Sequence, residues 1–307
     1  MTTTDGPPAG TSTSGGNAAP AHALRATLRF GVVGVTDLDR SLDFYRGGLG
    51  FRETAPEASP RGVRRRLLES EGRHLMLEEL LHPAASAWVN DDLQLGMRHI
   101  GFKVDDIDAW AERVRAAGAV FIREPFDAFG DVRIAFFLDP DGTHLELVQS
   151  VVRYTDVWSP VLARAEAAVP APQRPRFDHV ALSVGDLTAS LALYRDALGF
   201  DVIGQLEQRD DPRAFLITYV MAGEAILELF SFGLPLQPNP WHRDAEAPGL
   251  LRVGLGAADP AGAVRSLVSA GAVTVPGHAT GGHYPVTDAD GTPYEVSRLP
   301  TGPVASG

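Results

Sequence analysis

The chain has 307 residues, no cysteine and a formal net charge of −12 at pH 7. Its length suits two ordinary domains, and 44% hydrophobic against 21% charged residues is typical of a globular protein. The acidic balance argues against a broad nucleic-acid or anionic-membrane surface, and the lack of cysteine excludes disulfides, thiolate metal ligands and cysteine nucleophiles. No apolar run approaches the length of a membrane span.

The first segment, residues 1–24, is rich in Thr, Ser, Gly and Pro and has no apolar signal-peptide core. We therefore expect a disordered tail and a cytoplasmic protein. Further along, "RGVRRR" (Arg61 to Arg66) is the only dense basic run, and we expect it to form a solvated loop.

Two stretches of the chain are near duplicates: "FGVVGVTDLDRSLDFYRGGLGF" at 30–51 and "HVALSVGDLTASLALYRDALGF" at 179–200. Weaker copies begin at His99 and Arg252. In each copy a strand pattern of period two leads to an Asp that can cap a helix, and the helix ends near a Gly. The pattern predicts a repeated strand–helix unit followed by two or three further strands.

The ends of two units match as well. "FFLDPDGTHLELVQ" (136–149) and "YPVTDADGTPYEVSR" (284–298) share D-x-D-G-T with a Glu four residues after the Gly. The sequence thus predicts four modules, at about 25–82, 97–150, 175–233 and 249–300. We group them as an N-terminal half, 25–150, and a C-terminal half, 175–300, joined by a linker at 151–174 that holds one short helix.

The motifs "HVALSVGDLTASLALYRDALGF" and "DPDGTHLELV" resemble those of the vicinal oxygen chelate superfamily, over about residues 25–300. That superfamily includes glyoxalase I, methylmalonyl-CoA epimerase, fosfomycin- and bleomycin-resistance proteins, and extradiol dioxygenases. The resemblance implies an α+β fold in which βαβββ modules pair into two half-barrel sheets around a divalent metal. It also implies ligands at the start of the first strand and in the last strand of each module.

Carried over module by module, the resemblance implies these ligand positions: Phe30 with Glu78, His99 with Glu146, His179 with Glu228, and Arg252 with Glu295. If neighbouring modules paired, each site would have a single imidazole, and the Arg252 guanidinium would repel a cation. Crossed pairing of modules two with three and one with four gives one complete site and one pseudo-site around Phe30 and Arg252. We therefore expect crossed pairing, either within one chain or between the chains of a homodimer.

The complete set would be His99, Glu146, His179 and Glu228. Two imidazoles and two carboxylates suit one divalent ion, such as Fe, Ni, Zn, Co or Mn, with positions left for the adjacent oxygens of a substrate. Either Glu146 or Glu228 could act as the catalytic base.

Three functions remain open on the sequence. The first is a glyoxalase-like lyase or isomerase that acts on a small oxygenated substrate through an enediolate. The second is an extradiol-type dioxygenase with Fe(II) on His99, His179 and Glu146, which is disfavoured because "FDAFGDVRIAFFLDPDGTHLE" has no His upstream of Asp139. The third is a resistance protein that sequesters a ligand. In each case the partner is a small molecule, with no nucleic acid or membrane involved.

Overall fold

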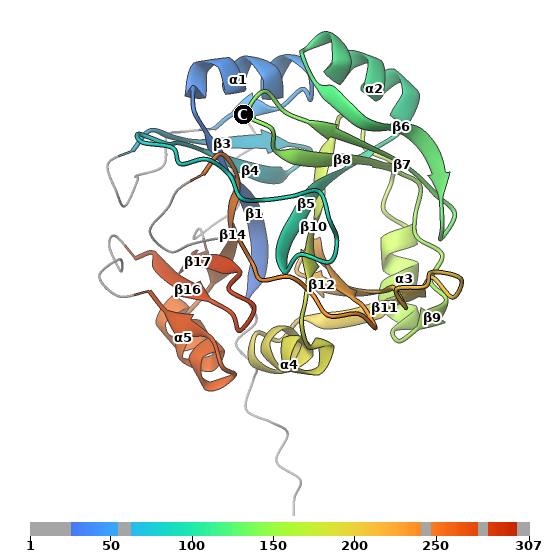
Figure 1. Cartoon of the computed structure of the whole chain (residues 1–307), viewed down its shortest axis with the longest axis vertical. Helices are drawn as coiled ribbons and strands as arrows, with labels where there is room; N and C mark the ends of the chain where they lie inside the picture. The colour runs from blue at the N-terminus through green and yellow to red at the C-terminus, as the bar shows by residue number, and fades with distance from the viewer. Residues whose placement is uncertain (1–25, 55–62, 241–246, 276–281, 300–307) are drawn as a thin grey trace, which may run out of the picture.

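A computed structural model of the chain describes residues 26–54, 63–240, 247–275 and 282–299, in which two sheets lie between peripheral helices (Figure 1). The tail predicted at 1–24 lies outside the described residues. In these segments no helix is long and apolar enough to cross a membrane.

The eight-stranded sheet has the order β15-β16-β17-β14-β1-β4-β3-β2 and is built from modules one and four. Its strands from module one are β1 (Thr27–Val35), β2 (Arg52–Glu53), β3 (Arg65–Ser70) and β4 (Arg73–Glu79). Its strands from module four are β14 (Gly249–Ala257), β15 (Val273–Thr274), β16 (Tyr284–Thr287) and β17 (Pro293–Arg298). The first strands of the two modules, β1 and β14, pair antiparallel at the centre.

The nine-stranded sheet has the order β6-β7-β8-β5-β10-β13-β12-β11-β9 and contains the strands of modules two and three. Module two supplies β5 (Gly96–Val104), β6 (Val120–Ala128), β7 (Val132–Leu138) and β8 (His144–Gln149). Module three supplies β10 (Arg176–Ser183), β11 (Asp201–Glu207), β12 (Leu216–Ala222) and β13 (Ala225–Ser231). Here β5 and β10 form the central antiparallel pair. The predicted α+β class is confirmed.

Each module has one helix after its first strand: α1 (Leu38–Gly47), α2 (Ile107–Ala116), α4 (Leu187–Leu191) and α5 (Pro260–Ser269). The helix α4 continues as a wider π-helical turn, η1 (Ala192–Ala197). An Asp side chain accepts a hydrogen bond from a first-turn N–H in all four, as predicted. These capping residues are Asp37, Asp106, Asp186 and Asp259.

The linker at 151–174 carries more structure than the single helix predicted for it. Its short strand β9 (Asp156–Val157) pairs with β11 at the edge of the nine-stranded sheet. The predicted helix is present as α3 (Pro160–Ala167), begun by a Ser159 cap. The linker thus extends the sheet that holds modules two and three.

The repeated Tyr and Asp of the motifs join modules that are neighbours in sequence. Tyr45 in α1 donates a hydrogen bond to Asp139 at 2.9 Å, in the turn before β8. Tyr194 in η1 donates to Asp288 at 3.0 Å, in the turn before β17. The helices therefore connect module one to two and three to four, whereas each sheet joins modules of different halves.

The central strands bury both faces. In β10, Val180 and Leu182 face the core beneath the helices, whereas His179 and Ala181 face the opposite side of the sheet. Because side chains alternate along a strand, the same alternation in β5, β8 and β13 brings their polar residues to the inner face of the sheet. That inner face forms the floor of a cavity.

Candidate metal centre

Four neighbouring strands, β8, β5, β10 and β13, each contribute one of the four predicted ligands to this floor. His99 comes from β5 and His179 from the adjacent β10. Glu146 of β8 lies opposite Gly101 of β5, and Glu228 of β13 lies opposite Ala181 of β10. All four side chains are buried, with at most 9% of each residue exposed.

The donor atoms of these residues converge. The Nε2 atoms of His99 and His179 lie 3.1 Å apart. Oε2 of Glu146 lies 2.9 Å from the His179 Nε2 and 3.3 Å from the His99 Nε2. Oε1 of Glu228 lies 3.7 Å from the His179 Nδ1. The structure therefore brings together all four residues that the sequence nominated, and their role as ligands stays a prediction.

The spacing of these atoms fits a metal ion. Two ligand atoms each about 2.1 Å from one ion, at roughly a right angle, lie about 3 Å apart. The distances among His99, His179 and Glu146 are of this size, and His99, His179 and Glu228 also offer atoms within 4.8 Å of one another. Nitrogen and carboxylate donors in this number suit a divalent transition metal.

The charges of the cluster favour a bound cation. Burial raises the pKa of Glu146, but the imidazoles of His99 and His179 outweigh it and bring the pKa to about 2. Burial and the charge of Glu146 raise the pKa of Glu228, although His179 opposes them. Burial lowers the pKa of His179, yet Glu228, Asp178 and Glu146 together hold it well above its usual value. A divalent cation would supply the positive charge that these carboxylates otherwise draw from a proton on His179.

Asp178 is a site residue that the sequence analysis missed. A β-bulge between Phe177 and His179 brings its carboxylate within 3.2 Å of the His179 Nδ1. Burial raises the pKa of Asp178, but Lys103, 3.7 Å away, together with His179 and Arg176, outweighs burial and lowers it. A carboxylate on the second ring nitrogen fixes the orientation of an imidazole. The "FDH" triplet is the one sequence signal that could have indicated it.

Gly101 makes room for His179. The two residues are partners in the β5–β10 register, and a Cβ on Gly101 would lie well inside contact distance of the imidazole ring. His144, also on the floor, packs against the rings of Phe136 and His99, and its nitrogens accept and donate no hydrogen bond among the described residues. Burial lowers the pKa of His144 to about 3, so it is neutral.

The floor belongs to a cavity of about 680 Å³ between the two modules. Its lining includes these rings and branched aliphatic side chains: Phe126, Phe136, Phe215, Phe230, Tyr219, Ile134, Ile217 and Leu206. A cavity with apolar walls beside a group of buried polar residues is a usual form of a small-molecule site.

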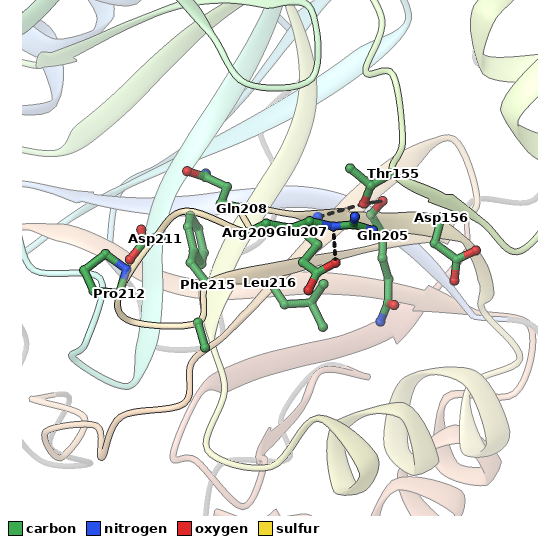
Figure 2. Close-up of a pocket in the computed structure, with 11 residues that line it drawn as sticks. Thr155, Asp156, Gln205, Glu207, Gln208, Arg209, Asp211, Pro212, Phe215 and Leu216 are labelled. Atoms are coloured by element: carbon green, nitrogen blue, oxygen red, sulfur yellow. Dashed lines mark hydrogen bonds and ion pairs between the residues drawn. The ribbon is translucent and has the colours of Figure 1, made fainter.

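A second, open hollow lies outside this cavity and shares Gln208 and Phe215 with it. Figure 2 shows Phe215 between the loop at Asp211 and the edge at Thr155. The hydroxyl of Thr155 accepts a hydrogen bond from the Glu207 backbone N–H at 2.9 Å. Because its polar groups are engaged in such local contacts, we assign no function to the hollow.

The equivalent floor of the eight-stranded sheet has a different composition. The bulges and register of β1 and β14 match those of β10 and β5, so Phe30 corresponds to His179 and Arg252 to His99. Glu295 lies opposite Gly254, as Glu146 lies opposite Gly101.

The sequence placed Glu78 at the position of Glu228, and this is wrong by two residues. The residue of β1 that corresponds to Ala181 is Val32, and its partner is Met76. Glu78 lies one step further along the same face of β4. Its carboxylate pairs with two guanidinium groups instead.

These guanidinium groups form a buried ion-pair network, which we call the arginine cluster: Arg65, Glu78, Arg252 and Glu295. Arg65 lies 2.9 Å from Glu78 and 3.0 Å from Glu295, and Arg252 lies 2.9 Å from Glu295 and also pairs with Glu78. Two guanidinium groups neutralise two carboxylates, so this floor needs no metal.

The burial of Arg65 corrects the prediction of a solvated loop for the basic run. Arg65 is 2% exposed and begins β3, because its guanidinium is held between Glu78 and Glu295. The first two residues of the run, 61 and 62, lie outside the described residues.

Known proteins share both the repeat and the fold. A family profile described as "Glyoxalase/Bleomycin resistance protein/Dioxygenase superfamily" matches residues 23–147 and 176–296. The chain belongs to this superfamily. The resemblance seen in the sequence is thereby confirmed, and the two matched segments correspond to the two repeated halves.

Individual curated proteins match parts of the chain. A lactoylglutathione lyase of Haemophilus influenzae is 35% identical over 132 residues, which are 41% of this chain and 91% of that protein. Two Arabidopsis thaliana relatives, both named as lactoylglutathione lyases, are 29% and 28% identical over 62% and 57% of this chain. The chain spans about half the length of these two, 47% and 55%.

Among solved structures, glyoxalase I from Zea mays aligns with a TM-score of 0.66 at 22% identity. The alignment covers 89% of this chain and 92% of the maize protein. At this identity the likeness shows that the two proteins share a fold.

Proposed function

We propose that this superfamily member is a metal-dependent lyase or isomerase that acts on a small molecule with two adjacent oxygens. The observation that carries the proposal is that His99, His179, Glu146 and Glu228 are buried together on the floor of one cavity, with the two imidazole Nε2 atoms and Glu146 within 3.3 Å of one another. A divalent ion held there would polarise a carbonyl and stabilise negative charge on oxygen.

Within this proposal, Glu228 is the base. Oε2 of Glu146 lies 2.9 and 3.3 Å from the Nε2 atoms of His179 and His99, whereas the contact of Glu228 is with the other ring nitrogen of His179, Nδ1, at 3.7 Å. The less tightly held carboxylate can turn toward the substrate, take a proton from the carbon next to the carbonyl and return it to the neighbouring carbon. His99, His179 and Glu146 are then left to hold the ion.

The names of the relatives favour this reaction class over ring cleavage by a dioxygenase. The relatives that match this chain include proteins named as lactoylglutathione lyases. A protein that only sequesters a ligand would not need a buried cluster of two imidazoles and two carboxylates. We therefore retain the lyase or isomerase as the single proposal.

Metal content tests whether these residues hold a metal ion. Elemental analysis of purified wild type is expected to show about one divalent ion per chain, and His99→Ala and His179→Ala are expected to lose it. Phe30→Ala, at the position equivalent to His179, is the matched control and should keep the ion. A wild type that stays metal-free after reconstitution would overturn the proposal.

Proton exchange tests whether the metal-loaded protein is a lyase or isomerase with Glu228 as its base. Metal-loaded wild type in deuterated water is expected to exchange the α-hydrogen of S-lactoylglutathione or of 2-hydroxyacetophenone, followed by NMR. Glu228→Gln should retain the metal and exchange about 10²- to 10⁴-fold more slowly, since it lacks the proton acceptor. If metal-loaded wild type exchanges neither compound, the lyase or isomerase function fails while the metal site stands.

A further inference from the structure

We propose that the substrate carries an apolar, ring-bearing body beside its two adjacent oxygens, and no cluster of carboxylates. This inference rests on the proposed function, because it describes the molecule that the same site would take. It follows from three features of the cavity: the rings beside the floor, the apolar rim and the charges around the entrance.

The first feature is the pair of rings next to His99. The ring of Phe136, from β7, has its centroid 5.4 Å from that of His99, and the ring of Phe230, from β13, lies at 5.9 Å. Phe215 continues the wall, with its centroid 5.1 Å from Phe230. A substrate whose oxygens lie over the floor would therefore have its carbon body against aromatic rings, which favour other rings and apolar groups.

The second feature is the rim. Ile122 and Phe129 both line the cavity, yet they are 40% and 51% exposed to solvent. Large apolar side chains that stay exposed at the mouth of a cavity commonly mark a ligand-binding surface. An apolar ligand would remove them from water on entry, which favours its binding.

The third feature is the balance of charge around the entrance. Arg213 is bonded at 2.7 Å to Asp211 and lies 3.5 Å from Asp92. Arg123 is the other arginine among the described lining residues. It has no carboxylate partner there, and its guanidinium stacks on Phe126 at 3.4 Å from the ring centroid.

Three lining carboxylates oppose these two cations: Asp91, Asp92 and Asp127. The entrance therefore has no net positive charge with which to attract a group that carries several carboxylates. A glutathionyl group carries two carboxylates and an ammonium, and Arg123 is the single guanidinium that the described lining leaves to pair with them. The charges thus favour a substrate with one carboxylate or none.

Two hydroxamates provide the test, because they chelate a metal through the same adjacent oxygens and differ only in their body. Benzohydroxamate carries a phenyl ring where acetohydroxamate carries a methyl group. Titrations of cobalt(II)-loaded protein, followed by cobalt absorption and calorimetry, are expected to show benzohydroxamate binding about tenfold or more tightly, because its ring is buried against the walls. S-methylglutathione, which has no free thiol, is expected not to displace benzohydroxamate at millimolar concentration.

Phe136→Leu removes a wall ring and is expected to lower the ratio of the two affinities several-fold. Phe137→Leu changes the next residue of β7, on the face that packs into the core, and should leave the ratio unchanged. Equal affinities for the two hydroxamates, or displacement by micromolar S-methylglutathione, would overturn the inference while leaving the metal enzyme intact. Failure of the protein to hold cobalt would instead overturn the proposed function, and this inference with it.

Discussion

The inner faces of the two sheets have the same backbone and different side chains. The nine-stranded sheet presents His99, His179 and two glutamates; at the equivalent positions the eight-stranded sheet presents Arg252, Phe30, Met76 and Glu295. Matching bulges and registers place these residues in equivalent positions. The fold therefore supplies only the position, and the residues decide whether a metal or a guanidinium neutralises the carboxylates.

The largest effect is expected from building a second metal site in the eight-stranded sheet. In an Arg65→Ile, Glu78→Phe background, which removes the guanidinium that otherwise pairs with Glu295, the triple variant Phe30→His, Met76→Glu, Arg252→His has two imidazoles and two carboxylates at the four equivalent positions. We expect metal content to rise from about one to about two ions per chain, measured by elemental analysis after reconstitution.

The control for this variant is Phe30→His, Met76→Glu in the same background, with Arg252 retained. Its guanidinium would still occupy the centre of the floor and repel a cation, so metal content should stay at about one. If the triple variant folds and also stays at one, backbone equivalence is not sufficient for a metal site.

Removing one cation from the arginine cluster should cost stability without affecting the metal. Arg252→Met leaves Glu78 and Glu295 buried with one guanidinium between them, so the free energy of unfolding is expected to fall by about 3–5 kcal/mol. Urea denaturation measures this change. Arg64→Met is the control, because Arg64 pairs with Asp39 and Glu79 at the surface and its loss should matter little. Loss of metal from Arg252→Met would show that the two floors are coupled.

The sequence predicted the parts of the two floors that repeat. The V-x-D-L motif fixes the first strand of each module, so His179 and its counterpart Phe30 follow from counting back from it. The D-x-D-G-T turn fixes Glu146 and Glu295 in the same way. Where a motif lies next to the residue, little room remains for an error in register.

The features that the sequence missed depend on contacts between distant segments. The position of Glu228 was assigned to Glu78 although Met76 holds it, because β4 lacks the D-x-D-G-T turn and a shift of two keeps a residue on the same face of a strand. The role of Asp178 depends on a bulge, which has no clear sequence signal. Arg65 reaches Glu295, 230 residues away, so a local pattern of charges could not indicate its burial.

A smaller difference is expected between substitutions of two equivalent glycines, Gly101 and Gly254, which lie opposite His179 and Phe30. Gly101→Ala would push the His179 ring out of place and is expected to weaken metal binding about 10- to 100-fold, as loss of an orienting contact does. Gly254→Ala would push Phe30 in the same manner and should leave metal affinity unchanged. Both variants should lose about 1–3 kcal/mol of stability from overpacking. Competition with a chromophoric chelator measures the affinities, and equal losses in both variants would contradict the comparison.

The smallest expected difference lies in the turn aspartates of the two sheets. Asp139 and Asp288 both accept a hydrogen bond from a Tyr, but their neighbours differ. Burial raises the pKa of both aspartates. Asp141, beside the first, is paired with Arg40 at 2.6 Å, whereas the charge of Asp290 adds to burial and brings the pKa of Asp288 to about 6.

A carboxyl whose pKa is raised on folding destabilises the fold when it is ionised. For Asp288 this cost is absent below its unfolded pKa of about 4, grows as pH rises through about 6 and is constant above. Between pH 4 and 7 wild type should therefore lose about 1–3 kcal/mol relative to Asp288→Asn, which keeps the carbonyl acceptor and cannot ionise. Urea denaturation of both proteins at several pH values measures the difference. A difference that is constant with pH would show that the pKa of Asp288 is not raised on folding.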